Sequence, residues 1–242
     1  MKSRYKTIGI LGGMGPEATA DLYMKIIRSF QVKFGAKYDS DFPPIVVYSL
    51  PLPDVVEEKG TEQKIIEALV FGVRKLQQAG VDFIVIPCNT VHIWMKEMRE
   101  SVQIPILSIA EEVCRFLKSK SYTKVGLLST GLTNRKRVFD RECEESNVEL
   151  LKTTEAEQQK VTQIIMAVLE GKVPDKEELQ LIFTRFSRQK AQAIILGCTD
   201  LPLIVTQDDS DIEIIDTTQV LAKAAVRECQ QNLFKQTSND DK

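Results

Sequence analysis

Two cysteines occupy positions where a protein can make a thiol reactive. Cys88 and Cys198 each follow a short apolar run and precede a segment that starts like a helix. The N-terminus of a helix carries partial positive charge and free N–H groups, which favour thiolate over thiol. A thiolate on one wall of a site can take a proton from carbon, and a thiol on the opposite wall can return one. The pair therefore indicates acid–base chemistry at a single carbon atom.

The residues beside each cysteine add groups that could bind a substrate or change the reactivity of the cysteines. Asn89, Thr90 and Thr199 follow the two cysteines and offer hydrogen-bond donors at the same predicted turns. Helix starts with such donors favour a bound carboxylate. His92 and Asp200 lie close enough in sequence to tune the cysteines.

The cysteine and histidine counts argue against other uses of these thiols. The chain has five cysteines and one histidine, and it contains no C-x-x-C motif. The odd cysteine count argues against a set of structural disulfides. A zinc site needs a recognisable cluster of three or four Cys or His ligands, and the sequence shows none. Cys114, Cys143 and Cys229 fall inside predicted helices and are expected to be buried. We therefore expect no metal site.

The elements that position the cysteines alternate along the chain. Apolar runs predict strands at 7–11, 45–50, 81–86, 104–107, 124–129, 148–151, 191–196 and 212–215. Amphipathic segments predict helices at about 16–34, 61–78, 133–146, 155–170, 175–190 and 217–234, with one more after Cys88. This alternation is typical of an α/β fold with mostly parallel sheets.

Three segments of the first half recur, in the same order, in the second half. Residues 8–11 resemble 125–128, 85–90 resemble 195–200, and 104–107 resemble 212–215. We expect two similar Rossmann-like lobes related by a pseudo-twofold axis, spanning 1–108 and 109–215. Residues 216–235 would form a helix that packs back on the first lobe, and 236–242 a disordered tail. Since ligands bind beyond the carboxyl ends of parallel strands, both cysteines should face one cleft.

Composition excludes several function classes. The 242 residues are 43% hydrophobic and 27% charged, with a formal net charge of −2. No basic stripe points to nucleic acid or to a membrane surface, and no apolar run reaches the length of a membrane span or a signal segment. A cytoplasmic protein is expected.

The motifs together resemble the aspartate/glutamate racemase family, closest to its aspartate racemase branch. The resemblance rests on Gly12–Pro16 (GGMGP), Pro87–His92 (PCNTVH) and Gly197–Thr199 (GCT), and it covers nearly the whole chain. It implies a racemase acting on amino acids without pyridoxal phosphate or another cofactor, working as a homodimer. It also implies Cys88 and Cys198 as the acid–base pair. The residues that it places against the substrate are Met14, Asn89, Thr90, Thr133 and Thr199.

The chain departs from this family where substrate identity is decided. Asp200 stands where the family commonly has Glu after its second Cys-Thr. Aspartate-specific members carry an arginine and a lysine at places that hold Val55 and Glu170 here. An acidic substrate brings a second carboxylate that needs such a cation. Arg135 and Lys136 remain as substitutes, and the choice between acidic and other amino acids stays open.

Three alternatives remain beside this interpretation. Gly13–Ala18 fits the G-x-G-x-x-A pattern of a dinucleotide oxidoreductase, but the second strand ends Tyr48-Ser49-Leu50 without the usual acidic residue. A relative of the same fold could use the cysteines for isomerisation, hydantoin racemisation or decarboxylation. A protein that only binds its ligand could have kept the lobes.

Overall fold

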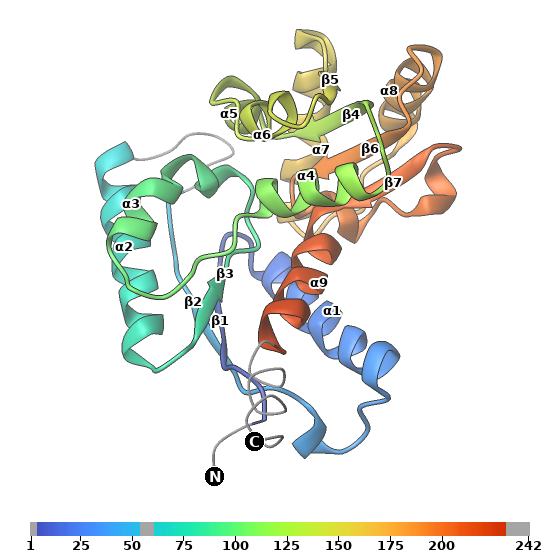
Figure 1. Ribbon diagram of the computed structural model, residues 1–242. Helices are drawn as coiled ribbons and strands as arrows, with labels where there is room; N and C mark the ends of the chain where they lie inside the picture. Colours follow the sequence, from blue (N-terminus) through green and yellow to red (C-terminus); the bar gives the residue numbers. More distant parts are fainter. Residues whose placement is uncertain (1–3, 54–60, 231–242) are drawn as a thin grey trace.

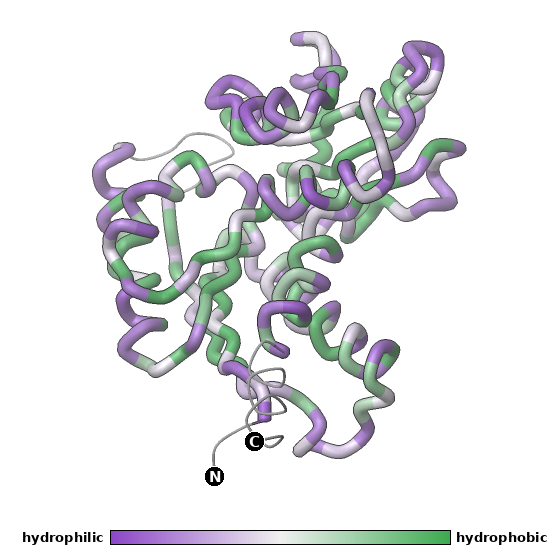
Figure 2. Tube along the Cα trace, viewed as in Figure 1, coloured by the Kyte–Doolittle hydropathy of each residue, from purple (hydrophilic) through white to green (hydrophobic). Residues whose placement is uncertain are grey.

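The structure is a computed structural model that describes residues 4–53 and 61–230. Two α/β lobes lie one above the other, each built on its own parallel sheet (Figure 1). This confirms the expected fold class. The strands at 8–12, 83–85, 124–129 and 193–197 are rich in hydrophobic residues (Figure 2) and almost entirely buried, as expected for parallel strands covered on both faces.

The first lobe carries a three-stranded sheet in the order β2-β1-β3. Its elements are β1 (Ile8–Gly12), α1 (Pro16–Phe34), η1 (Asp39–Asp41), β2 (Ile45–Ser49), α2 (Glu62–Gln78), β3 (Phe83–Val85), η2 (Thr90–Trp94) and α3 (Met95–Glu100). Pro16 begins α1, and Thr61 caps α2 by accepting a hydrogen bond from the Lys64 N–H. Both starts follow the preferences of helix N-termini.

The second lobe carries a four-stranded sheet in the order β5-β4-β6-β7. Its elements are α4 (Ile109–Ser119), β4 (Lys124–Ser129), α5 (Gly131–Arg135), α6 (Asp140–Glu144), β5 (Glu149–Leu151), α7 (Glu155–Leu169), α8 (Glu177–Arg188), β6 (Ala193–Gly197), η3 (Leu201–Leu203), η4 (Gln207–Asp209), β7 (Glu213–Asp216) and α9 (Thr217–Cys229).

The two sheets repeat the same strand order. In each, the first strand lies between the second and third, and every described pairing is parallel. In the second lobe β7 adds a fourth strand beside β6, whereas in the first only Ile106 pairs with Ile84, as an isolated parallel bridge. The strand predicted at 104–107 is therefore wrong in extent, although its one bridge lies at the position equivalent to β7.

A second expectation fails between β4 and β5. The single helix predicted at 133–146 is two short helices, α5 and α6. Arg137 between them adopts a positive φ of 57°, which a continuous right-handed helix does not contain. The break leaves α5 as a short helix directly beyond the end of β4.

Helix α9 packs against α1 of the first lobe (Figure 1). Leu221 and Ala225 are fully buried in the same apolar cluster as Ile8 and Ile26. The chain thus leaves the first lobe at α4, builds the second sheet and returns. Residues 231–242, including the predicted tail, lie outside the described part.

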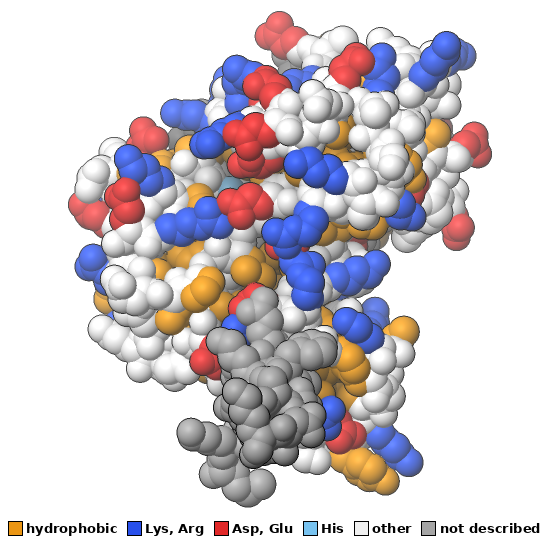
Figure 3. Space-filling view, viewed as in Figure 1, with side chains coloured by type: hydrophobic (Ala, Val, Ile, Leu, Met, Phe, Trp, Pro, Cys, Tyr) orange, Lys and Arg blue, Asp and Glu red, His pale blue; other side chains and the backbone are white. Residues whose placement is uncertain are grey.

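No helix among the described residues is long and apolar enough to cross a membrane. Lys and Arg side chains are intermixed with Asp and Glu over the face shown in Figure 3, in keeping with the near-neutral net charge.

Candidate active site

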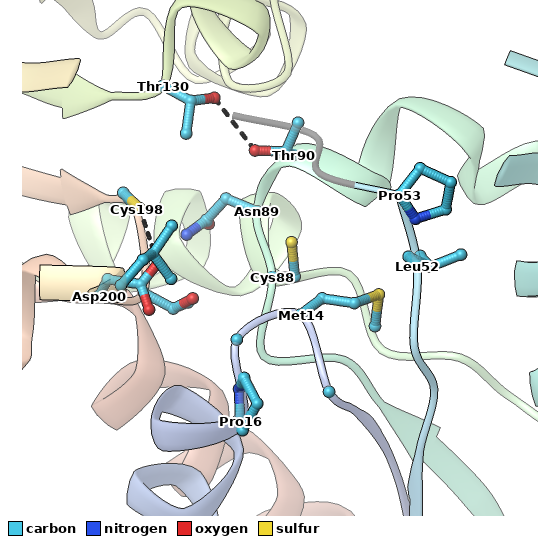
Figure 4. A pocket seen from close by; sticks show the side chains of 14 residues that line it. Met14, Pro16, Leu52, Pro53, Cys88, Asn89, Thr90, Thr130, Cys198 and Asp200 are labelled. Carbon is cyan, nitrogen blue, oxygen red and sulfur yellow. Dashed lines mark hydrogen bonds between the residues drawn. The ribbon is translucent and has the colours of Figure 1, made fainter. Parts of the chain in front are cut away.

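A cavity of about 210 Å³ lies where the carboxyl ends of the two sheets meet. Turns after β1 and β3 of the first sheet and after β4 and β6 of the second line it, as the strand-end rule predicts. These turns are Gly13–Pro16 after β1, Cys88–Thr90 after β3, Thr130 after β4 and Cys198–Asp200 after β6. Leu52, Pro53 and Leu169 complete the described lining, and Figure 4 shows the arrangement.

Glycines let the β1 turn fit into this space. Gly13 has a φ of +93°, and a Cβ there would lie 2.6 Å from the backbone of Leu50. A Cβ on Gly15 would lie 3.2 Å from both Asp200 Oδ1 and Leu169 Cδ2. A side chain at Gly13 would therefore clash with the backbone of its own lobe, whereas Gly15 lets the first lobe approach Asp200 and Leu169 of the second closely.

Both cysteines reach the cavity, one from each lobe, and neither is in a disulfide (Figure 4). Each is only 5% exposed. The Cys198 thiol donates a hydrogen bond to Asp200 Oδ2 at 3.4 Å. The structure thus brings together the two thiols that the sequence singled out.

The pKa of Cys198 departs from the sequence-based expectation. Burial, and then the negative charge of Asp200, raise the pKa of the Cys198 thiol well above its usual value. We expected a helix start to lower it. The segment that follows is only the short η3, Leu201–Leu203, and such a turn supplies too little dipole to offset burial beside a carboxylate.

Threonine hydroxyls join the lobes around the cavity. Thr90 of the first lobe bonds Thr130 at 3.1 Å and Thr133 at 3.0 Å, and these two bond each other at 2.9 Å. Thr199 of the second lobe donates to the Pro87 carbonyl at 3.0 Å. The turns that carry the cysteines are therefore tied to the opposite lobe.

The amide nitrogen of Asn89 is hydrogen-bonded, whereas its amide oxygen has no partner among the described residues. Its Nδ2 donates to Thr217 Oγ1 at 3.2 Å, and that hydroxyl donates to the Leu196 carbonyl at 2.8 Å. Its Oδ1 is buried and has no hydrogen-bond partner among the described residues. A buried amide oxygen without a partner is costly, so a ligand that donates a hydrogen bond would satisfy it.

His92 holds a backbone turn rather than lining the cavity. Its Nδ1 lies 2.8 Å from the Cys88 carbonyl, and its Nε2 accepts a hydrogen bond from the Ile109 N–H at 3.0 Å. Burial lowers the pKa of His92 to about 4. The neutral ring therefore donates from Nδ1 to the Cys88 carbonyl and connects this turn to the start of α4.

The remaining sequence-based candidates divide into three groups. Met14, Asn89, Thr90, Thr199 and Asp200 line the cavity with the two cysteines. Thr133 does not line the cavity but forms a hydrogen bond with Thr90, which does. The three cysteines assigned to helices are buried elsewhere, with the Cys114 and Cys143 sulfurs 3.4 Å apart.

None of the substrate-selecting positions considered from the sequence lines the cavity in the described part of the chain. Val55 lies outside the described residues. Glu170 is about half exposed and pairs with Lys172. Arg135 lines a different cavity, and Lys136 lies 4.0 Å from Glu62 on the surface.

Outside the GGMGP motif, sequence reasoning missed four lining residues. Thr130 could have been found, because it directly follows β4 at the end equivalent to that of β1. Leu52, Pro53 and Leu169 carry no motif and reach the cavity only through the packing of the lobes. Residues 4–53 and 61–230 contain no group of three or more His, Cys, Asp or Glu side chains suited to a metal ion.

One named protein is similar in sequence to this chain over nearly its whole length. The broad specificity amino-acid racemase RacX of Bacillus subtilis (strain 168) is 32% identical over 221 residues, which cover 90% of this chain and 96% of RacX. A glutamate racemase of Aquifex pyrophilus is 26% identical over 155 residues, covering 61% of this chain and 58% of that protein.

Solved structures share the two-lobed architecture. An aspartate racemase homologue from Pyrococcus horikoshii OT3 has a TM-score of 0.78 and 27% identity, covering 92% of this chain and 98% of that one. The aspartate racemase of Picrophilus torridus has a TM-score of 0.76 and 28% identity, covering 92% and 93%. The profile of the family described as Asp/Glu/Hydantoin racemase matches residues 11–225. The chain therefore belongs to the Asp/Glu/hydantoin racemase family.

Proposed function

We propose that this chain is a cofactor-independent amino-acid racemase in which Cys88 and Cys198 exchange the Cα proton. The observation that carries the proposal is that two unbridged thiols, one from each lobe, line a single cavity. Inversion at carbon needs one group that removes a proton and another that delivers one to the opposite face. The named racemases among the relatives support the same assignment.

The polar groups of the cavity suit the two charged groups that all free amino acids share. The open Oδ1 of Asn89 can accept a hydrogen bond from the α-ammonium group. Thr199 lines the cavity after Cys198, and we expect its backbone N–H to bind the α-carboxylate, because its hydroxyl already donates to the Pro87 carbonyl. The substrate would thus be held by its common atoms, with Cα between the sulfurs.

The reaction then proceeds in two proton transfers. One cysteine, as thiolate, takes the Cα proton, and the electron pair of the C–H bond remains on the substrate as a carbanion conjugated with the carboxylate. The other cysteine, as thiol, gives its proton to the opposite face of Cα. The product is the other enantiomer, and the two cysteines have exchanged protonation states. Asp200, which accepts the Cys198 S–H hydrogen bond, favours the thiol form of that residue between turnovers.

Incubation in D₂O tests the proposal without assuming a substrate. We expect proton NMR to show loss of the Cα–H signal from one or more L- and D-amino acids, with chiral chromatography showing the opposite enantiomer. A chelator, or a carbonyl reagent that traps pyridoxal phosphate, should leave the rate unchanged, whereas a thiol-alkylating reagent should abolish it. Release of carbon dioxide without Cα exchange, or no reaction with any amino acid, would contradict the proposal.

We also infer that the protein acts in the cytoplasm, and that it forms a homodimer, which the family resemblance implies. Light scattering coupled to size-exclusion chromatography should give twice the chain mass of 27.3 kDa. A mass of one chain at working concentration would contradict the dimer.

A further inference from the structure

We propose that the cavity selects amino acids with uncharged side chains, and that aspartate and glutamate are poor substrates. The inference rests on the proposed function and deepens it, because it names the substrate class from the described lining of the same cavity.

The cavity has one wall for the shared amino-acid atoms and another for the side chain. The polar wall holds Asn89, Thr90 and Thr199 with the cysteines. The other wall is apolar: Leu52 and Pro53 lie together on one side of Cys88, and Met14 lies below it (Figure 4). A substrate held by its ammonium and carboxylate groups therefore meets hydrocarbon with its side chain.

Leu169 adds an apolar side chain to the cavity lining from the second lobe, near Asp200. It is the last residue of α7, and its Cδ2 lies 3.2 Å from the position that a Cβ on Gly15 would occupy. Leu169 and Gly15 thus meet across the two lobes at the cavity. The residue that follows, Glu170, is directed to the surface, where it pairs with Lys172.

The only charged side chain in the described lining is the carboxyl group of Asp200. No lysine or arginine of residues 4–53 and 61–230 lines this cavity. A second substrate carboxylate would lose water without gaining a cation, and it would share the cavity with Asp200. Burying an unpaired charge costs far more than burying a neutral amide of the same shape.

A long basic side chain finds no better partner among these residues. Glu170 already pairs with Lys172 outside the cavity. Asp200 accepts the Cys198 thiol hydrogen bond and lies on the opposite side of Cys88 from Leu52 and Pro53 (Figure 4). An uncharged side chain is the class that this lining fits.

Pairs of substrates with nearly the same shape isolate the charge. We expect Cα exchange in D₂O to give a kcat/KM for asparagine above that for aspartate, and for glutamine above that for glutamate, by roughly tenfold or more. Leucine, methionine and norvaline should be at least as good as the amides, because they leave no polar group against the apolar wall. Lysine and arginine should fall below them.

One substitution should weaken the selectivity. Leu169→Lys places an ammonium group in the cavity lining, and we expect it to raise the aspartate-to-asparagine ratio of kcat/KM by about tenfold. Val173→Lys is the matched control, since Val173 is 92% exposed and does not line the cavity. It should leave the ratio as in the unaltered protein.

The outcomes separate this inference from the proposed function. If aspartate or glutamate, or lysine or arginine, were the best substrate, the function would stand and the substrate class would be wrong. If no amino acid exchanged its Cα proton, the proposed function itself would be wrong. The comparison with the unaltered protein decides the substrate class even if Leu169→Lys proves inactive.

Discussion

The hydroxyl of Thr199 donates a hydrogen bond to the carbonyl of Pro87 at 3.0 Å. Thr199 follows one active-site cysteine candidate and Pro87 precedes the other, so this one bond joins the two cysteine turns across the lobes. A site that transfers protons on both faces of one carbon needs its two proton-carrying groups held at a fixed distance and orientation. This bond, with the threonine contacts of Thr90, provides that arrangement before any ligand binds.

Replacing Thr199 by valine should therefore weaken both stability and activity. Valine keeps the shape but leaves the buried Pro87 carbonyl without its donor, and we expect the free energy of unfolding to fall by about 1–2 kcal/mol. The kcat/KM should fall by more than the stability change alone explains, since the cysteine turns lose their alignment. Urea denaturation and steady-state kinetics measure the two effects.

Thr184→Val is the matched control for that substitution. The Thr184 hydroxyl bonds only the Gln180 carbonyl of its own helix and is exposed. Its loss should change neither quantity appreciably. Equal effects of the two substitutions would show that the bond between the lobes has no special role.

Asp200→Asn should lower the pKa of Cys198. The carboxylate of Asp200 contributes, after burial, to the raised pKa of that thiol, and an amide removes the negative charge while keeping an acceptor. We expect the pH profile of Cys198 alkylation to move to lower pH. The rates should be measured by mass spectrometry in a Cys88→Ala background, with and without the Asp200→Asn substitution. An unchanged profile, or one moved to higher pH, would remove Asp200 from this role.

The single histidine should make the protein less stable in mild acid. The pKa of His92 is lowered from 6.5 to about 4 because its ring is buried. The unfolded chain therefore binds a proton that the folded chain does not, and stability is lost as pH falls from about 6.5 to 4. This contribution amounts to roughly 3 kcal/mol over the range.

His92→Gln tests that pH dependence, because the variant has no imidazole to titrate. We expect it to be less stable at neutral pH, since it loses the paired bonds of the ring. The difference in unfolding free energy between the two proteins should shrink as the pH falls. A constant difference from pH 7 to pH 4 would mean that His92 titrates with an ordinary pKa.

The sequence could predict the parts of the site that lie on strand ends. Parallel strands end at the same edge of a sheet, so the repeated motifs after β3 and β6 were enough to predict that Cys88 and Cys198 line one cavity, as they do. The repeat also predicted the lobes, since each half carries its own apolar strands. Local pattern could not predict Leu169, whose place at the cavity depends on how α7 of one lobe packs against Gly15 of the other.

Local rules also misjudged two features of the second lobe. The helical pattern of 133–146 contains no proline, yet Arg137 breaks it at a positive φ. A helix-start argument for a reactive Cys198 ignored burial and the charge of Asp200, which act in the opposite direction. For Cys198, burial in the folded protein outweighed the local preference.

The most direct measurement of the two-cysteine account follows each enantiomer with single-cysteine variants. Cys88→Ala and Cys198→Ala should each fold and each lose racemisation, by at least about 10²–10⁴-fold, because inversion needs both proton carriers. Each variant should still exchange the Cα proton of one enantiomer with D₂O, and the two variants should act on opposite enantiomers. Cys114→Ala, a buried cysteine away from the cavity, should racemise like the unaltered protein. Racemisation at the unaltered rate by either single variant would contradict the account.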